Sequence, residues 1–241
     1  MLPRRDTALI ASLRREIGRV ALRPHGVLPF GLAAIDAHLP GGGLARGALH
    51  EVEGEAGARI GFAACLAGRL QRQLGQPVVW VSSRPELYGP GLARLGLDPG
   101  RLLLVRAARP ADLLWAFEEA LRTPGIAAVI GEAHALDAVA GRRLQLAAQA
   151  GGALGLLLLH KESGNVPGAV TRWQVRAAQS MSDLPGLGPT RWQADLRRCR
   201  GAEPASWLME WQDATDSAAG GFAVIGEPLD RPHRPAIRIA G

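Results

Sequence analysis

The chain has 241 residues, of which 47% are apolar and 21% are charged, with a formal net charge of +6. This length and apolar fraction indicate one domain with a substantial core, and no apolar run reaches the roughly 18–20 residues that cross a bilayer, which excludes a helical membrane protein. Two cysteines exclude a disulfide framework. The charged N-terminus lacks the apolar stretch of a signal peptide, so we expect a cytoplasmic protein, with association with the nucleoid left open.

The first segment predicts an amphipathic helix. Leu9, Leu13 and Ile17 share one stripe with Ile10 and Val20, and arginines occupy the opposite side. The stretch RPHGVLPFG then has the proline and glycine punctuation of a linker. We therefore assign residues 1–25 to a helical arm and linker. Leu9, Leu13 and Ile17 are candidate contacts of this arm with another molecule, and packing back on its own domain is the alternative.

The middle of the chain alternates between short apolar runs and helical patterns. The runs lie at 48–54, 77–83, 101–107, 126–132 and 153–160. One of the helical patterns between them has its apolar residues at Phe62, Leu66 and Leu70. Buried strands that alternate with helices predict βαβ units, so we expect a mainly parallel sheet covered by helices on both faces.

The apolar period changes after about residue 168. Trp173 and Val175 alternate with arginine and glutamine, and the stretches TRWQADLRRCR and SWLMEW follow the same two-residue period. This alternation is typical of antiparallel strands with one buried face, so we expect Trp173 and Trp192 to point into the core. Residues 213–241, rich in Gly, Pro, Asp and Ser, predict a flexible tail. The α/β core with its antiparallel meander then covers residues 26–212.

The stretch EVEGEAGARIGF joins a predicted strand to a predicted helix through glycines, which is where a nucleotide-binding protein carries the loop G-x-x-x-x-G-K-[ST]. Gly54 and Gly57 could form the turn, but the positions for Gly, Lys and Ser/Thr hold Arg59, Ile60 and Gly61. Neither serine nor threonine occurs in 48–81, and the chain has one lysine, Lys161. We interpret Gly54, Gly57 and Arg59 as a degenerate nucleotide loop. Arg59 as a phosphate clamp is one alternative, and a purely structural turn is the other.

The other elements of such a site are also altered. Glu132 ends an apolar strand where an acidic metal-binding residue would stand, and a helix cap is its expected role. The position of a water-activating glutamate falls on Arg84 or Glu86, depending on the gap placed. No His or Cys has metal-ligand spacing. We therefore expect no catalytic residues, no metal site, and no ATP or Mg²⁺ cofactor.

Cations gather where the parallel part of the chain ends. Lys161 and Arg172 flank the predicted connection to the antiparallel strands, and Arg176, Arg191 and Arg197 follow on those strands. Together they could form a positive stripe that contacts a partner, or DNA weakly and without sequence preference. The alternative is a solvated sheet face.

Two long stretches, VLPFGLAAIDAHLPGGGLARGALHEVEGE and LYGPGLARLGLDPGRLLLVRAARPADLLWAFEEAL, resemble the core of RecA-type ATPases, and the pattern covers residues 26–212. With the TRW-containing strands and PASWLMEW, the chain is similar to the ImuA family, whose members are RecA-like and related to SulA.

This resemblance implies an accessory role in SOS-induced, mutagenic translesion DNA synthesis. It also implies an ImuB-like Y-family polymerase homologue as partner, with RecA and an error-prone replicative-type polymerase as further candidates. With the degenerate loop, we expect a non-catalytic RecA-like adaptor of the DNA damage response. An active DNA-dependent RecA-type ATPase and a SulA-like inhibitor that binds another assembly are the alternatives.

Overall fold

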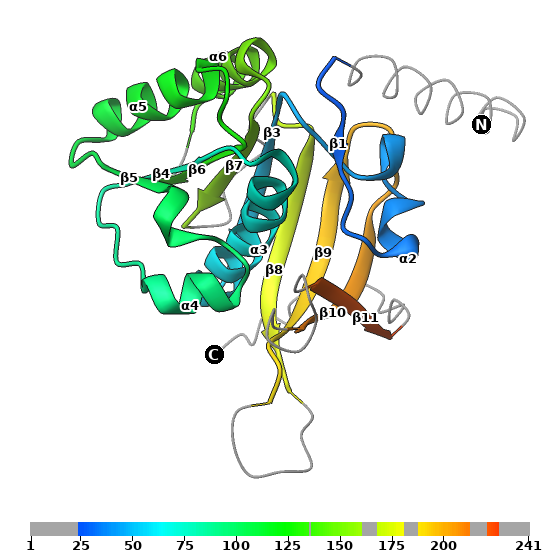
Figure 1. The fold of residues 1–241 in the computed structure, drawn as a ribbon. Coiled ribbons are helices and arrows are strands. Elements are labelled where there is room, and N and C mark those ends of the chain that lie inside the picture. The colour runs from blue at the N-terminus through cyan, green and yellow to red at the C-terminus, as the bar shows by residue number, and fades with distance from the viewer. Residues whose placement is uncertain (1–23, 135, 161–167, 181–187, 213–220, 227–241) are drawn as a thin grey trace, which may run out of the picture.

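The computed structural model describes residues 24–134, 136–160, 168–180, 188–212 and 221–226. Leu9, Leu13, Ile17 and Lys161, and most of the predicted tail, lie outside the described residues. The described chain is a mixed α/β structure with one large sheet, parallel on one side and antiparallel on the other, as predicted (Figure 1).

The large sheet has nine strands in the order β11-β10-β9-β8-β3-β7-β6-β4-β5. Its parallel part contains β3 (Ala48–Gly54), β4 (Val78–Ser82), β5 (Leu102–Arg106), β6 (Ala128–Ala133) and β7 (Leu154–Leu159). The remaining strands are β8 (Thr171–Ala178), β9 (Arg191–Cys199), β10 (Ala205–Gln212) and β11 (Gly221–Gly226). β8 runs parallel to β3 and antiparallel to β9, so it joins the two parts of the sheet. β11 continues the sheet into the segment that was expected to be a tail.

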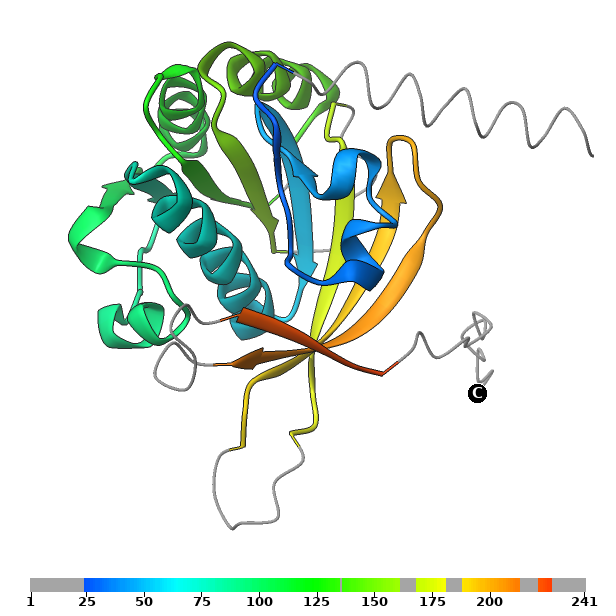
Figure 2. The same ribbon diagram turned by 45° about the vertical axis from the view of Figure 1, so that its right-hand side comes forward.

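Helices cover both faces of the parallel part (Figures 1 and 2). α3 (Ala56–Leu74) packs on one face, and α5 (Pro110–Arg122) and α6 (Ala138–Gly151) lie side by side on the other. The predicted stripe Phe62, Leu66 and Leu70 is the buried side of α3, which confirms the helical period. The smaller elements are β1 (Val27–Leu28), α2 (Ala33–Asp36), η1 (Pro40–Gly42), β2 (Leu44–Ala45), α4 (Gly89–Arg94) and η2 (Pro99–Arg101).

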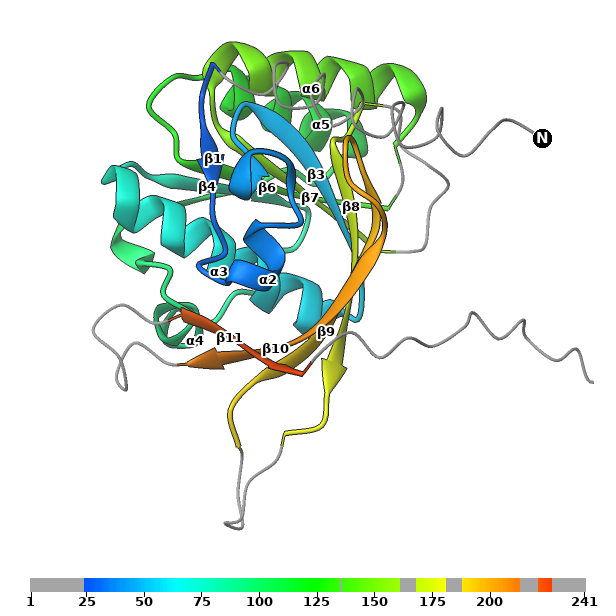
Figure 3. The ribbon, with the colours of Figure 1, turned by 90° about the vertical axis from the view of Figure 1, so that its right-hand side faces the viewer.

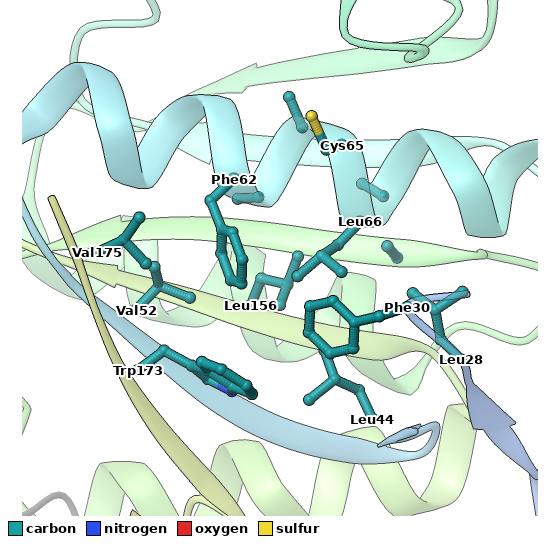
Figure 4. Packing of buried hydrophobic residues seen from close by; sticks show 14 of the residues in the cluster. Leu28, Phe30, Leu44, Val52, Phe62, Cys65, Leu66, Leu156, Trp173 and Val175 are labelled. Atoms are coloured by element: carbon teal, nitrogen blue, oxygen red, sulfur yellow. The ribbon is translucent and has the colours of Figure 1, made fainter. Parts of the chain in front are cut away.

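Aromatic side chains fill the space between α3, the first described segment and the antiparallel strands (Figure 4). The ring of Phe30 lies 5.5 Å from that of Trp173 and 6.0 Å from that of Phe62. Phe222 of β11 lies 5.8 Å from Phe30. Trp173 and Trp192 are 0% and 2% exposed, so their predicted inward orientation is confirmed. Tilted aromatic pairs of this kind contribute both buried area and ring–ring attraction. They join four segments that are distant in the sequence: the segment before α2, α3, β8 and β11.

Asp36 holds the turn that leads Phe30 into this cluster. Its carboxylate accepts hydrogen bonds from the backbone N–H groups of Phe30, Gly31 and Leu32, at 2.7, 2.9 and 3.1 Å. These donors precede α2 and would otherwise lack partners. Gly31 has a φ of 78°, which favours glycine. One aspartate therefore orders the turn and fixes the direction from which the Phe30 side chain enters the core.

His50 forms a fully buried polar network at the middle of β3. Its Nε2 lies 2.8 Å from the Ala45 carbonyl, which can only accept, so the proton is on Nε2. Nδ1 then accepts from the Thr171 hydroxyl at 2.8 Å, and that hydroxyl accepts from Trp173 Nε1 at 3.0 Å. Burial lowers the pKa of His50 to about 4. The neutral ring therefore suits the fold, because protonation of Nδ1 would break the hydrogen bond that Nδ1 accepts from the Thr171 hydroxyl.

We predict that His50 makes the protein less stable in mild acid. The unfolded chain binds a proton near the ordinary pKa of 6.5 and the folded chain only near 4, so the contribution is complete above pH 6.5 and is lost as the pH falls towards 4. The full loss is about 3 kcal/mol. Urea unfolding at pH 7 and pH 5 should show about 2 kcal/mol of this loss, with His50→Gln as the matched control, in which this part of the pH dependence should disappear. An NMR titration showing a His50 pKa near 6.5 would contradict the prediction.

Candidate functional site: the junction after Gly54

The strand–helix junction after Gly54 lies at the carboxyl ends of the parallel strands, which is where α/β sheets bind ligands. The structure brings Gly54, Arg59 and Glu132 together there, from β3, α3 and β6. Gly57 is exposed on the first turn of α3 and takes no part in these contacts. Three of the four residues of the predicted degenerate site are therefore neighbours.

No phosphate-binding loop separates the strand from the helix. β3 ends at Gly54 and α3 begins at Ala56, which leaves Glu55 alone between them. The Glu55 carboxylate accepts a hydrogen bond from the Ala177 backbone N–H at 3.1 Å, so it ties the junction to β8. A phosphate loop encloses its ligand with several consecutive backbone N–H groups. This junction lacks that enclosure, and it lacks the lysine and the hydroxyl, so its residues do not fit a nucleoside triphosphate with Mg²⁺.

The steric demands at the two glycines, Gly54 and Gly57, differ. Gly54 has a φ of 118°, and a Cβ placed on it would lie 2.0 Å from the Val175 carbonyl oxygen of β8. Gly57 lies within helical geometry, and a Cβ there would meet nothing within 4 Å. Glycine is therefore required at position 54, where β3 lies close to β8. At position 57 the described structure has room for a side chain.

The side chain of Arg59 is buried at this junction and is hydrogen-bonded to its neighbours. It is 4% exposed, and its Nη1 donates to the Gly54 carbonyl at 3.1 Å. Its Nη2 donates to Nδ1 of His160, at the end of β7, at 2.8 Å. Burial lowers the pKa of the Arg59 guanidinium, and the nearby Glu132 carboxylate opposes this shift. A phosphate clamp needs exposed donors, whereas two of the Arg59 nitrogens already bind the protein.

Glu132 lies beside Arg59 and His160. Its Oε1 accepts from Trp80 Nε1 at 2.7 Å, and its Oε2 lies 4.0 Å from His160 Nε2. His160 also stacks on the ring of His134, at 4.6 Å. Burial, Arg59 and His134 lower the pKa of His160, and Glu132 opposes them. The helix cap expected of Glu132 is supplied by Asp137 instead, whose Oδ1 accepts from the Ala140 N–H at 2.7 Å. Glu132 lies within β6, before the strand ends, so its side chain bonds to Trp80 instead of capping the next helix.

Sequence reasoning missed Trp80 and His160 as members of this group. Both lie in predicted strands, and His160 ends the last parallel one. For His160 the available signal was its position, because the strand ends of a parallel sheet converge and polar residues there meet. Trp80 is the middle residue of β4, so this signal did not apply to it. Which of them meet Arg59 depends on strand order, which the sequence did not provide.

The arginines of the predicted stripe share one face of β8 and β9, and each has an acidic partner. Arg172 contacts Glu51 at 3.3 Å and Glu53 at 2.6 Å, and Arg191 contacts Glu210 at 2.7 Å. Arg176 and Arg197 both contact Asp195, at 2.8 and 3.2 Å. Only Arg176 and Arg197 have side chains about half exposed, at 48% and 46%. The face is therefore a set of ion pairs, between strands and within β9, rather than a row of unpaired cations.

Two further observations concern the described part of the chain. None of its helices is both long and apolar enough to cross a membrane. Within the same residues, no group of three or more His, Cys, Asp or Glu side chains is arranged to hold a metal ion.

The fold and this junction define a mixed α/β protein with a large, mostly parallel sheet, in which the buried Arg59 joins the strand–helix junction after Gly54 to His160. No family model matches the sequence. Among curated proteins, the chain is 41% identical over 209 residues to Protein ImuA of Caulobacter vibrioides (strain NA1000 / CB15N), covering 79% of this chain and 86% of the relative, with the same values for the protein of strain CB 15. The chain belongs to the ImuA family. It is also 30% identical over 109 residues to the cell division inhibitor SulA of Edwardsiella piscicida, covering 44% of this chain and 65% of that protein.

We predict opposite outcomes for alanine at the two loop glycines. Gly54→Ala should lower the free energy of unfolding by about 2 kcal/mol or more, because the added Cβ clashes with Val175 and the backbone is strained. Gly57→Ala should be neutral or stabilising by up to about 1 kcal/mol, since alanine favours a helix. Urea unfolding of both variants measures the difference. Equal effects would mean that Gly57 is needed in a loop conformation that the structure does not contain.

A second prediction concerns the arginine network. Arg59→Met should lower the free energy of unfolding by about 2–4 kcal/mol, because Gly54 and His160 lose their donor and Glu132 loses a buried cation. The pKa of His160 should rise, since a neighbouring positive charge is removed. Arg59→Lys is the matched control, because it keeps the charge but not the paired donors. It should keep the pKa of His160 low, while the free energy of unfolding should recover less. Unchanged stability and His160 titration in Arg59→Met would contradict the network.

Proposed function

We propose that this protein is a non-catalytic accessory protein of an SOS-induced complex for mutagenic translesion DNA synthesis. The observation that carries the biological role is the 41% identity to ImuA proteins over most of both chains. The resemblance of the sequence to the ImuA family implies this role, and the proposal assigns it to this chain. Its action would take place in the cytoplasm, at or near the nucleoid.

The proposed partner is an ImuB-like Y-family polymerase homologue. An adaptor of this kind needs a stable scaffold and accessible surfaces, and it needs no chemistry of its own. RecA and an error-prone replicative-type polymerase are further candidate partners of the same complex. DNA contact would be weak and salt-sensitive, because phosphates would have to displace the carboxylates that already bind Arg172, Arg176, Arg191 and Arg197.

The proposed lack of ATPase activity is supported by the junction itself. Arg59 is buried against Gly54 and His160, Glu55 alone connects strand to helix, and residues 48–81 contain neither serine nor threonine. Phosphoryl transfer depends on positioned cations and on a metal ion. Glu132, the remaining acidic residue, is engaged with Trp80.

A SulA-like inhibitory role is the second candidate, favoured by the partial identity to the cell division inhibitor. The two roles differ in their partner: a polymerase homologue for the first, and the division apparatus or a RecA filament for the second. Both use the same fold without nucleotide chemistry, so nucleotide assays do not separate them.

We predict no measurable binding of ATP with Mg²⁺, meaning a Kd weaker than about 1 mM by isothermal titration. RecA serves as the positive control in the same buffer. Micromolar affinity that Arg59→Ala abolishes would overturn the non-catalytic proposal and favour the ATPase.

The partner is tested by pulldown with the full-length tagged chain. The polymerase homologue from the same organism, its division GTPase and its RecA are supplied separately at equal concentration. We expect retention of the polymerase homologue. Retention of the division GTPase or RecA without the polymerase homologue would favour the SulA-like role instead.

A further inference from the structure

One edge of the nine-stranded sheet is formed by an apolar strand, β5. Among the described strands, β5 pairs with β4 alone and stands last in the sheet (Figure 1). Four of its five residues, Leu102 to Val105, are apolar, and the strand ends at Arg106. Alternate residues of an edge strand direct their backbone N–H and C=O groups away from the sheet. These groups are available to pair with a further strand.

Two leucines of β5 are exposed on opposite faces of the sheet. Leu103 and Leu104 are 56% and 49% exposed. Their neighbours on β4, Val79 and Trp80, are 4% and 0% exposed. Consecutive strand residues point to opposite faces, so Leu103 lies on the side of α5 and Leu104 on the side of α3, and Figure 3 shows these helices on opposite sides of the sheet. A helix docked on one face would cover one leucine, whereas a strand added at the edge would cover both.

Both ends of β5 are positively charged. Arg101 immediately precedes the strand and Arg106 ends it, and no acidic residue lies between them. Arg106 is exposed and forms no ion pair within the described residues. Arg101 lies 3.8 Å from Asp98, and more than half of each of these two side chains is exposed. An added strand with acidic ends would therefore meet opposite charge, whereas a second copy of β5 would bring like charges together.

We propose that β5 is a docking site for an extended segment of another protein, which joins the sheet as an additional edge strand. The segment has successive apolar residues at its centre, which cover Leu103 and Leu104, and acidic residues at its ends, which pair with Arg101 and Arg106. Main-chain hydrogen bonds to β5 supply affinity that does not depend on its exact sequence. Three strands separate this edge from β3, so the site is distinct from the junction after Gly54. It does not depend on which protein supplies the segment, and its test is independent of the proposed function.

Peptide binding to the full chain tests the chemistry of the site. The probe is a synthetic peptide with a central run of valines and glutamates at both ends, and in the matched control peptide lysines replace the glutamates. We expect the glutamate peptide to bind about tenfold or more tightly than the lysine peptide at low salt, because its ends meet Arg101 and Arg106. Arg106→Glu should reduce this preference. Isothermal titration measures the Kd of each peptide.

Nuclear magnetic resonance of the isotope-labelled chain locates the bound peptide. The backbone amide signals of residues 102–106 should shift on binding, and hydrogen exchange of alternate amides among them should slow, because they gain hydrogen bonds to the peptide. Leu104→Ser should weaken binding about fivefold, since apolar contact is lost. Val139→Ser is the matched control, because it changes an exposed apolar residue of α6 and should leave the Kd unchanged. Circular dichroism checks that both variants are folded.

Four results would overturn the proposal. The first three are a Kd weaker than about 1 mM for both peptides, equal affinity for the two, and binding that leaves the amides of β5 unchanged. The fourth is a dimer of the free chain that Leu104→Ser dissociates, which would mean that a second copy occupies the edge.

Discussion

The packing of Phe30, Phe62 and Trp173 is the interaction on which the rest of the structure depends. These rings come from the segment before α2, from α3 and from β8, and Phe222 adds β11 to the same cluster. The contact therefore joins the parallel part of the sheet, its antiparallel extension and the first described residues on one side of α3 (Figure 4). Asp36 contributes by ordering the turn before α2, and the Trp173 ring also donates into the His50 network. Core and polar network are consequently one unit.

The junction after Gly54 is constrained by the same arrangement. β8 approaches β3 so closely that only glycine fits at position 54, and Glu55 binds the backbone of β8. Arg59 then turns inward and meets His160 and Glu132 at the carboxyl ends of β7 and β6. Positions that would surround phosphate in a nucleotide-binding protein are here joined to one another. The chemistry that remains is that of a buried, hydrogen-bonded cation, which stabilises a fold and specifies its geometry.

The polar face of β8 to β10 is stabilised by ion pairs, unlike the apolar core. Arginines alternate with inward tryptophans along β8 and β9, and acidic residues on neighbouring strands lie opposite them. Cross-strand ion pairs of this type keep a sheet face soluble without a helix to cover it. The outer side of α5 and α6 contrasts with it, because the apolar side chains of Trp115, Val139 and Leu146 are exposed there. Contacts with other proteins would therefore have two chemically distinct surfaces available.

The sequence by itself determined the class of fold, the order of its elements and the altered chemistry at the junction. Apolar periods of 3.6 and 2 residues depend on burial of local faces, so the strands 48–54 and 153–160, the helix around Phe62 and the inward Trp173 followed from the pattern alone. The missing lysine and hydroxyl were likewise readable from residue types. Only the tertiary structure decided that Arg59 meets His160, that Asp137 rather than Glu132 caps α6, and that Arg172 is bound by Glu51 and Glu53. The contact of Arg59 with His160 joins residues 101 positions apart, and that of Arg172 with Glu53 joins residues 119 positions apart. Strand order and register bring them together, and a local pattern carries no information on either.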